Sequence, residues 1–160
     1  MSRETPFGHI AVCVDRSRAT AAALEEARRL RRLGPGRLTL VHVVEDAATS
    51  PAAWSLPDPE QLRRALTRWL AGMARPDEGE EVVLLEGEHP AEAVVEWAER
   101  AGVDLIVASA HRGRIQRALL GSFAAHLAYH APCPVLLVRP GRDGEPGAEP
   151  SDGPRRGAGA

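Results

Sequence analysis

The residues best suited to bind an anion lie in the segment 108–122, which reads ASAHRGRIQRALLGS. His111, Arg112 and Arg114 place three side chains that can carry positive charge within four positions, before a predicted helix. Gly113 lies among them and has no Cβ to block the approach of a ligand. Arginine forms charge-assisted hydrogen bonds with phosphate, and a helix N-terminus attracts anions. The pattern indicates either a phosphate site or a loop of ordinary solvated arginines.

Two further positions carry polar groups where a ligand would bind. Gly121-Ser122 precedes the predicted helical residues Phe123–His130, and Ser122 is a candidate N-cap for them. An exposed helix N-terminus also attracts phosphate, so capping and ligand binding are compatible roles. Asp15 ends the first apolar run and either accepts N–H groups at the start of the next helix or faces a ligand.

Other reactive residue types do not predict a catalytic or metal centre. His126 and His130 have the i, i+4 spacing of a helical metal-binding pair, but no carboxylate flanks them and no H-E-x-x-H pattern is present. A solvated helical face is the favoured interpretation. Cys13 and Cys133 lie in apolar runs without a neighbour that would activate a thiol. We therefore interpret both as small buried hydrophobic residues.

Alternating apolar runs and amphipathic segments predict the scaffold. The predicted strands are His9–Val14, Arg37–Val44, Glu81–Leu85, Asp104–Ala108 and Val135–Val138. The predicted helices are Arg18–Leu33, Pro59–Ala74, a segment from Pro90 that ends at Gly102, and Ile115–His130. This alternation predicts an α/β fold with a doubly wound parallel sheet and helices on both faces. The carboxyl ends of such strands form the usual ligand crevice.

Local signals refine the helix ends. Ser17 is the predicted N-cap of the first helix. Four arginines load the last turns of that helix with positive charge, which suits the helix dipole: Arg28, Arg29, Arg31 and Arg32.

Composition limits the class of protein. The 160 residues are 44% hydrophobic and suffice for one domain, which we assign to residues 7–140. The 20 basic residues are all arginine. The chain also has 22 acidic residues, which gives a formal net charge of −2. Binding to nucleic acid or to anionic membranes is therefore not expected. Without lysine, a Schiff-base lysine and a Walker A lysine are excluded.

The two ends of the chain carry separate expectations. Residues 141–160 hold six glycines and three prolines, and we expect this tail to be disordered. The opening MSRETPFG lacks the apolar core of a secretory signal, and no apolar stretch approaches the length of a membrane span. We therefore expect a cytoplasmic protein.

From about Phe7 to Pro140 the chain resembles the universal stress protein family. The matching pieces, in order, are Val14-Asp15, Leu38–Val44, Gly87–Ala93, Ala101–Val107 and Arg117–Ser122. Each piece is weak alone, but their order and spacing together are specific. The resemblance implies five parallel strands in the order 3-2-1-4-5. It also implies a homodimer made through the last strand, which comprises Val135, Leu136, Leu137 and Val138.

Some members of the family bind adenine nucleotides, which makes ATP with Mg²⁺ the implied ligand. Those members carry G-x-x-G, nine residues and then G-[ST]. Counting back from Gly121-Ser122 puts Ala108 and His111 at the two glycine positions, whereas counting forward from the fourth strand puts Ser109 and Arg112 there. In either register only the final pair matches, so the motif is degenerate. Side chains at those positions can obstruct the approach of phosphate to backbone amides.

The resemblance also assigns a role to each part of the site. Asp15 matches an aspartate that helps hold the nucleoside. Val43 matches a position whose backbone contacts adenine, although a core strand residue is the better interpretation of a valine there. The phosphates are expected at the loop 108–114 and at the start of the last helix, namely Gly121, Ser122 and Phe123.

Three hypotheses about function follow. The first is a regulatory or protective dimer without enzymatic activity that binds ATP or a related adenine nucleotide. The second is a dimeric interaction module whose crevice is occluded and binds no nucleotide. The third, a nucleotide hydrolase, is the least favoured, because the loop Asp15–Arg18 lacks glycine and no acid–base pair supports turnover.

Overall fold

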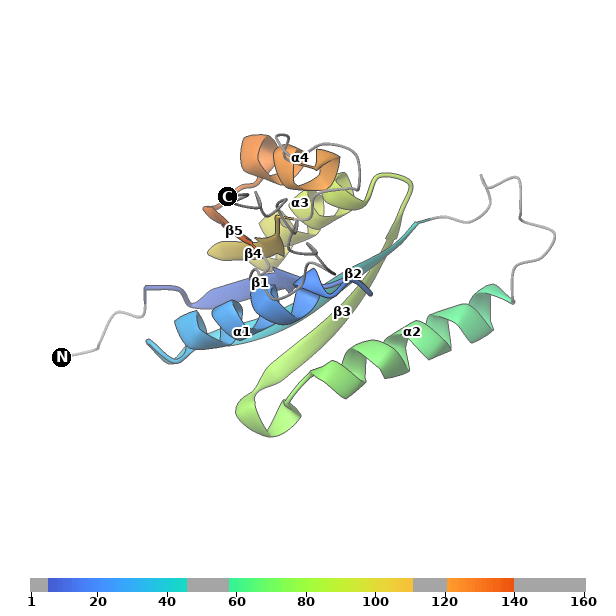
Figure 1. The fold of residues 1–160 in the computed structure, drawn as a ribbon, viewed down its shortest axis with the longest axis horizontal. Helices are drawn as coiled ribbons and strands as arrows, with labels where there is room; N and C mark the ends of the chain where they lie inside the picture. Colours follow the sequence, from blue (N-terminus) through green and yellow to red (C-terminus); the bar gives the residue numbers. More distant parts are fainter. Residues whose placement is uncertain (1–5, 46–57, 111–120, 140–160) are drawn as a thin grey trace, which may run out of the picture.

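The computed structural model describes residues 6–45, 58–110 and 121–139, which form a five-stranded parallel sheet with helices on both faces (Figure 1). The strands are β1 (His9–Cys13), β2 (Arg37–Glu45), β3 (Glu80–Gly87), β4 (Leu105–Ser109) and β5 (Val135–Val138). The helices are α1 (Ala19–Arg31), α2 (Pro59–Met73), α3 (Pro90–Ala101) and α4 (Ser122–His130), with a 3-10 turn η3 (Pro76–Glu78). The sheet order is β3-β2-β1-β4-β5, and each neighbouring pair is parallel. The predicted fold class and strand order are confirmed.

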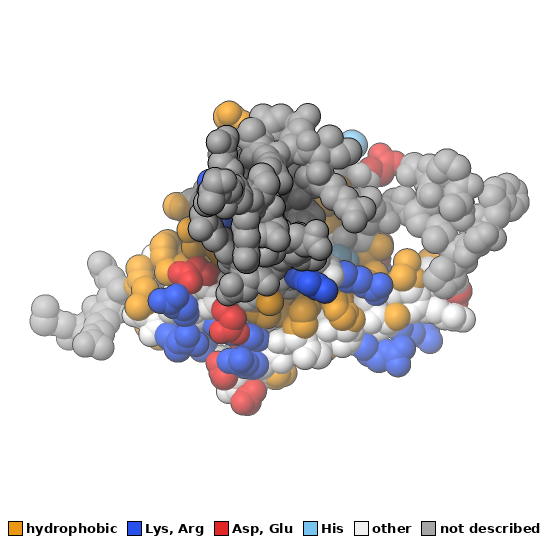
Figure 2. Space-filling view, viewed as in Figure 1, with side chains coloured by type: hydrophobic (Ala, Val, Ile, Leu, Met, Phe, Trp, Pro, Cys, Tyr) orange, Lys and Arg blue, Asp and Glu red, His pale blue; other side chains and the backbone are white. Residues whose placement is uncertain are grey.

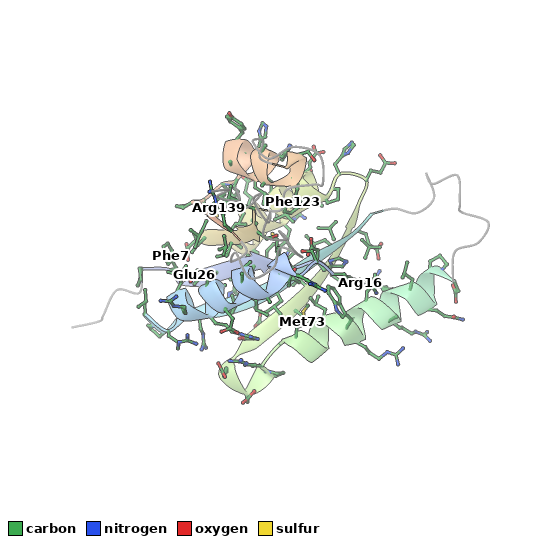
Figure 3. All side chains as sticks on the ribbon, viewed as in Figure 1. Phe7, Arg16, Glu26, Met73, Phe123 and Arg139 are labelled. Atoms are coloured by element: carbon green, nitrogen blue, oxygen red, sulfur yellow. The ribbon has the colours of Figure 1, made fainter. Side chains whose placement is uncertain are left out.

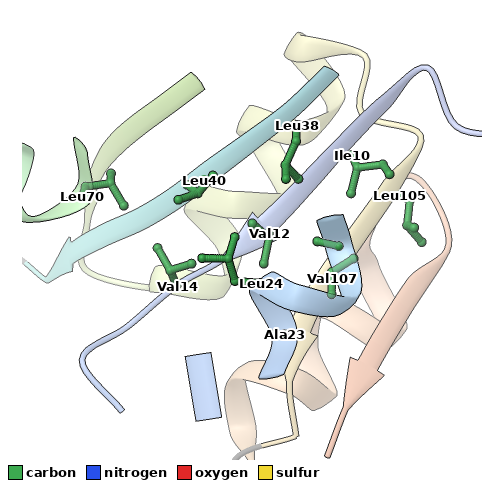
Figure 4. Packing of buried hydrophobic residues seen from close by; sticks show 11 residues of the cluster. Ile10, Val12, Val14, Ala23, Leu24, Leu38, Leu40, Leu70, Leu105 and Val107 are labelled. Carbon is green, nitrogen blue, oxygen red and sulfur yellow. The ribbon is translucent and has the colours of Figure 1, made fainter. Parts of the chain in front are cut away.

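Each central strand is buried on both faces, which explains its nearly continuous apolar sequence. Ile10 and Val12 of β1 pack into one core with residues of α1 and α2, as Figure 4 shows in close-up for α1. Ala11 packs into the second core with residues of α3 and α4. The chain therefore winds along one face for its first half and along the other for its second. A crevice forms where such winding reverses, at the carboxyl ends of β1 and β4.

Both predicted serine caps are wrong. Arg18, not Ser17, is the N-cap of α1, and it makes no side-chain capping bond. The Ser17 N–H donates to Asp15 Oδ1 at 2.8 Å, a bond that belongs to the turn before the helix. At α4 the N-cap is Gly121, and Ser122 is the first helical residue. The start of α3 at Pro90 and its end before a left-handed Gly102 are confirmed.

The arginines at the end of α1 do not share one environment. Arg28 is buried, and its guanidinium donates from Nε to Glu80 Oε1 at 2.7 Å and from Nη2 to Glu80 Oε2 at 2.9 Å. Nη2 also donates to the Met73 carbonyl at 2.8 Å, and the Arg75 amide donates to Glu80 at 2.8 Å. Burial alone would raise the pKa of Glu80, but the bonds from Arg28 and Arg75 hold it below its usual value. The pair therefore joins α1 to the start of β3 and the end of α2.

Within the described ranges, no helix is both long and apolar enough to cross a membrane.

Candidate functional site

A crevice of about 880 Å³ lies at the carboxyl ends of β1, β2 and β4, between the starts of α3 and α4. It brings together six residues that the sequence selected from four separate segments: Asp15, Val43, Ala108, Gly121, Ser122 and Phe123. The volume lies within the range of roughly 300–1,000 Å³ that is typical of small-molecule sites. Four other selected residues, His111, Arg112, Gly113 and Arg114, lie outside the described residues, as do the predicted tail 141–160 and the residues 115–120 predicted as helical.

Asp15 is exposed and lies one residue beyond the last sheet bond of the first strand, in which Val14 N–H donates to the Val41 carbonyl at 2.9 Å. The Asp15 amide donates to the Thr20 hydroxyl at 2.8 Å, and that hydroxyl lies 2.7 Å from Asp15 Oδ1. With the Ser17 bond, these contacts fix the carboxylate at the rim of the crevice. The carboxylate thus accepts the N–H group of Ser17, which lies in the turn before α1.

The start of α4 presents backbone N–H groups to the crevice. Ser122 is exposed, Gly121 is half-buried, and no side chain in the described part of the protein caps this helix. Gly121 has φ −59° and ψ 153°, a conformation open to any residue, so its use lies in the missing side chain and not in a left-handed turn. The N-terminal amides of a helix carry a partial positive charge and favour an anion beside them.

The opposite wall of the crevice is apolar. Val41 and Val43 of β2 line it with Ala91 and Val94 of α3. Val43 is half-buried and also packs against the core on the α3–α4 face. Val43 therefore has both roles, because it lines the crevice and fills part of the core. A flat apolar group can therefore lie against β2 while a polar group reaches Asp15 or α4.

The structure adds polar residues that the sequence did not assign to the site. Glu92 and His89 from the start of α3 and His126 from α4 line the crevice with His42 of β2. The sequence did hold a signal for His89 and Glu92 as site residues. Both lie close to Pro90, where the carboxyl end of β3 leads into α3. The described lining holds carboxylates and imidazoles but no arginine.

His42 is held in place by its neighbours. Its Nδ1 lies 2.8 Å from the Val14 carbonyl, to which it donates, and its ring meets Trp69 of α2 edge-on at 5.0 Å between centroids. His42 thus links the crevice to the face of the sheet that α1 and α2 cover.

Cys13 and Cys133 are half-buried, and both pack against the core on the α3–α4 face. Desolvation, with the nearby charge of Asp15, raises the pKa of Cys13 to about 12. Desolvation also raises the pKa of Cys133. Both thiols therefore stay protonated at neutral pH, which does not suit a nucleophile. Among the described residues, no three histidine, cysteine or acidic side chains are grouped to hold a metal ion.

Comparison with known proteins places this geometry in a family. A model described as the universal stress protein family matches residues 6–139. A universal stress protein of Thermus aquaticus is 36% identical over 135 residues, covering 76% of this chain and 88% of that protein. One from Methanothermobacter thermautotrophicus is 33% identical over 79 residues, which is 49% of this chain and only 53% of the relative.

A solved structure extends the comparison to a ligand. A universal stress protein in complex with cAMP is 25% identical, with a TM-score of 0.57, and the match covers 83% of this chain and 97% of that one. That protein shares the fold described above. Together, the match to residues 6–139 and the 36% identity to the Thermus aquaticus relative show that this chain belongs to the universal stress protein family.

Proposed function

We propose that the protein binds an adenine nucleotide, with ATP and Mg²⁺ as the leading ligand, in the crevice at the carboxyl ends of its strands. The crevice itself carries the proposal, because its 880 Å³ joins an apolar wall, a fixed carboxylate and an uncapped helix start. The cAMP complex of a structural relative supports the choice of an adenine nucleotide.

Each part of the crevice suits one part of a nucleotide. The apolar wall at Val41 and Val43 fits the face of a purine, and the Asp15 carboxylate can accept hydrogen bonds from ribose hydroxyls. The amides at Gly121 and Ser122 suit phosphate oxygens. Arg112 and Arg114 are the proposed source of positive charge, since the described lining supplies no arginine.

We further propose that the protein acts as a regulatory or protective homodimer rather than as an enzyme. The two cysteine thiols are held in the protonated form, which does not suit a nucleophile. The four residues of β5 are half-buried, and β5 lies at an edge of the sheet, where a second copy can add a strand. Light scattering tests this: a mass near twice 17.2 kDa is expected, and a monomer across micromolar concentrations would refute it. The cytoplasmic location stays a prediction.

Thermal unfolding with ATP and Mg²⁺ tests nucleotide binding. A ligand that binds only the folded state, at a hundredfold excess over Kd, is expected to raise Tm by roughly 5–10 °C. Ser122→Glu places a carboxylate at the first position of α4, where it competes with phosphate yet stabilises the helix by about 0.3–1 kcal/mol. The variant should therefore fold at least as well and bind ATP about tenfold or more weakly.

Gln61→Glu is the matched control for this variant. Gln61 is exposed in the first turn of α2, so the substitution adds a negative charge near the start of a helix that does not line the crevice. ATP affinity should stay within twofold. The absence of any shift in Tm with ATP, or an equal loss of affinity in both variants, would contradict the proposal and leave the interaction module with an occluded crevice as the better account.

A further inference from the structure

A second hollow, a groove of about 660 Å³, lies on the other side of the sheet from α3 and α4, between α1 and α2. Its floor is apolar and comes from both helices, with Leu24 on α1 and Trp69 and Met73 on α2. Figure 2 shows hydrophobic side chains in this gap with basic side chains along its border, and Figure 3 places Arg16 and Met73 there. The two helices therefore leave a lined groove between them, which the bond from Arg28 to the Met73 carbonyl bridges.

One end of the groove is positively charged. Arg16 and Arg18 are exposed, and neither forms an ion pair with any residue in the described ranges. The two carboxylates of the groove are engaged elsewhere, because Asp15 accepts from the Ser17 amide and Glu25 lies 3.2 Å from Arg28 Nη1. The charge left over at this end is cationic.

Two further features make this end of the groove suited to a ligand: a cation–π contact and a buried hydroxyl without a partner. The Arg16 guanidinium carbon lies 5.7 Å from the centroid of the Trp69 ring, so a cation and an aromatic face already meet at one place. The Ser17 hydroxyl beside it is buried and has no hydrogen-bond partner in the described structure. Buried polar atoms are normally satisfied, so an unpartnered hydroxyl beside two arginines is notable.

We propose that this groove is a second binding site, which takes a small planar aromatic molecule bearing a carboxylate or sulfonate group. The ring lies against Trp69 and the Met73 thioether, since sulfur and aromatic rings attract each other. The anionic group pairs with Arg16 and Arg18. The site is independent of the proposed nucleotide crevice, although Asp15 lies at the border of both.

Titration of the full chain with 2-naphthoate, followed by ¹H–¹⁵N NMR, tests the site. The indole Nε1–H signal of Trp69, assigned with Trp69→Phe, should shift and saturate together with the amides of residues 15–18. The double variant Arg16→Gln/Arg18→Gln should bind about tenfold or more weakly. Both side chains are exposed, so this variant is expected to fold. Neutral 2-naphthamide should also bind the unchanged protein at least tenfold more weakly.

Arg32→Gln/Arg68→Gln is the matched control, because both arginines are exposed, lie outside the groove and carry the same total charge. Its affinity for 2-naphthoate should stay within twofold. The proposal is overturned if both double variants lose affinity equally, if the acid and the amide bind alike, or if no signal shifts. It is also overturned if the shifts occur at Gly121 and Ser122, which would mean that the probe enters the crevice.

Discussion

The two ends of the parallel strands use their polar side chains in opposite ways. Near the amino ends, His9, Thr39 and Glu80 are buried and bonded to other protein groups, with His9 Nε2 2.8 Å from Thr39 Oγ1. At the carboxyl ends, Asp15 and Ser122 are exposed around a crevice. Polar groups that satisfy one another stabilise the fold, whereas polar groups that face water can exchange it for a ligand. The buried polar groups at the amino ends therefore stabilise the fold, and the proposed nucleotide site lies at the carboxyl ends.

The largest expected effect comes from breaking the buried ion pair. Arg28→Met should lower the free energy of unfolding by about 3–5 kcal/mol, because the Glu80 carboxylate stays buried without its partner. Arg29→Met is the control, because the Arg29 side chain is 70% exposed and its Nη1 lies 3.4 Å from Glu26 Oε2. This substitution should lower the free energy of unfolding by less than about 0.5 kcal/mol. Urea denaturation measures both. Equal costs would show that the pair contributes little to stability.

A smaller effect is expected from pH at the same end. Burial and then the charge of Arg37 lower the pKa of His9, so the folded protein favours neutral imidazole while the unfolded chain titrates near its usual value of about 6.5. The unfolded state therefore binds more protons below that pH, and stability is lost as pH falls from 7 toward the folded pKa.

His9→Gln should flatten this slope in urea denaturations between pH 7 and 5.5. His130→Gln changes an exposed histidine and should keep the slope of the unchanged protein. If His9→Gln retained the full slope, the loss would have to arise at another group.

A matched pair of aspartates separates the two ends most clearly. Asp15 accepts the Ser17 amide and Asp104 accepts the His9 amide, at 2.8 and 2.9 Å, and both residues are exposed. Asp15→Asn and Asp104→Asn should each cost at most about 1 kcal/mol of stability. Only Asp15→Asn should weaken ATP binding, as measured by calorimetry. Equal losses of affinity would remove the distinction between the ends.

The smallest effect is expected at Cys13. With its pKa near 12, this thiol should react with iodoacetamide at pH 8 far more slowly in the folded protein than in urea. Mass spectrometry of the labelled peptide measures the rate. Fast labelling in the folded state would reveal an activated thiol in the crevice and revive an enzymatic function.

The strands and helices were predictable because each carries a local signal. Strands buried on both faces read as apolar runs, and Pro90 and Gly102 mark the ends of α3. The strand order came from the family resemblance, since alternation alone does not set it. The cap at Ser17 was wrong because α1 begins at Ala19 with Arg18 as its N-cap, and Ser17 lies in the preceding turn, where its amide donates to Asp15. The residue at which such a turn gives way to a helix depends on backbone geometry, which the sequence does not display.

Long-range contacts explain the features that the sequence analysis did not predict. The burial of Arg28 depends on Glu80, 52 residues away, and a helical pattern treats Arg28 like its neighbours. Asp15 was found because the carboxyl ends of parallel strands converge, and Ser122 because it begins a predicted helix and matches the family's G-[ST] pair. His126 joins them only through the packing of α3 against α4, which has no signature in its own segment.

An ATP–Mg²⁺ titration followed by amide NMR tests the central claim most directly, because it reports on both ends of the strands at once. The account predicts saturable shifts at Asp15, Gly121 and Ser122, with the amides of His9 and Asp104 unchanged. Saturable shifts centred on His9 and Asp104, or no saturable shift at any amide, would contradict it.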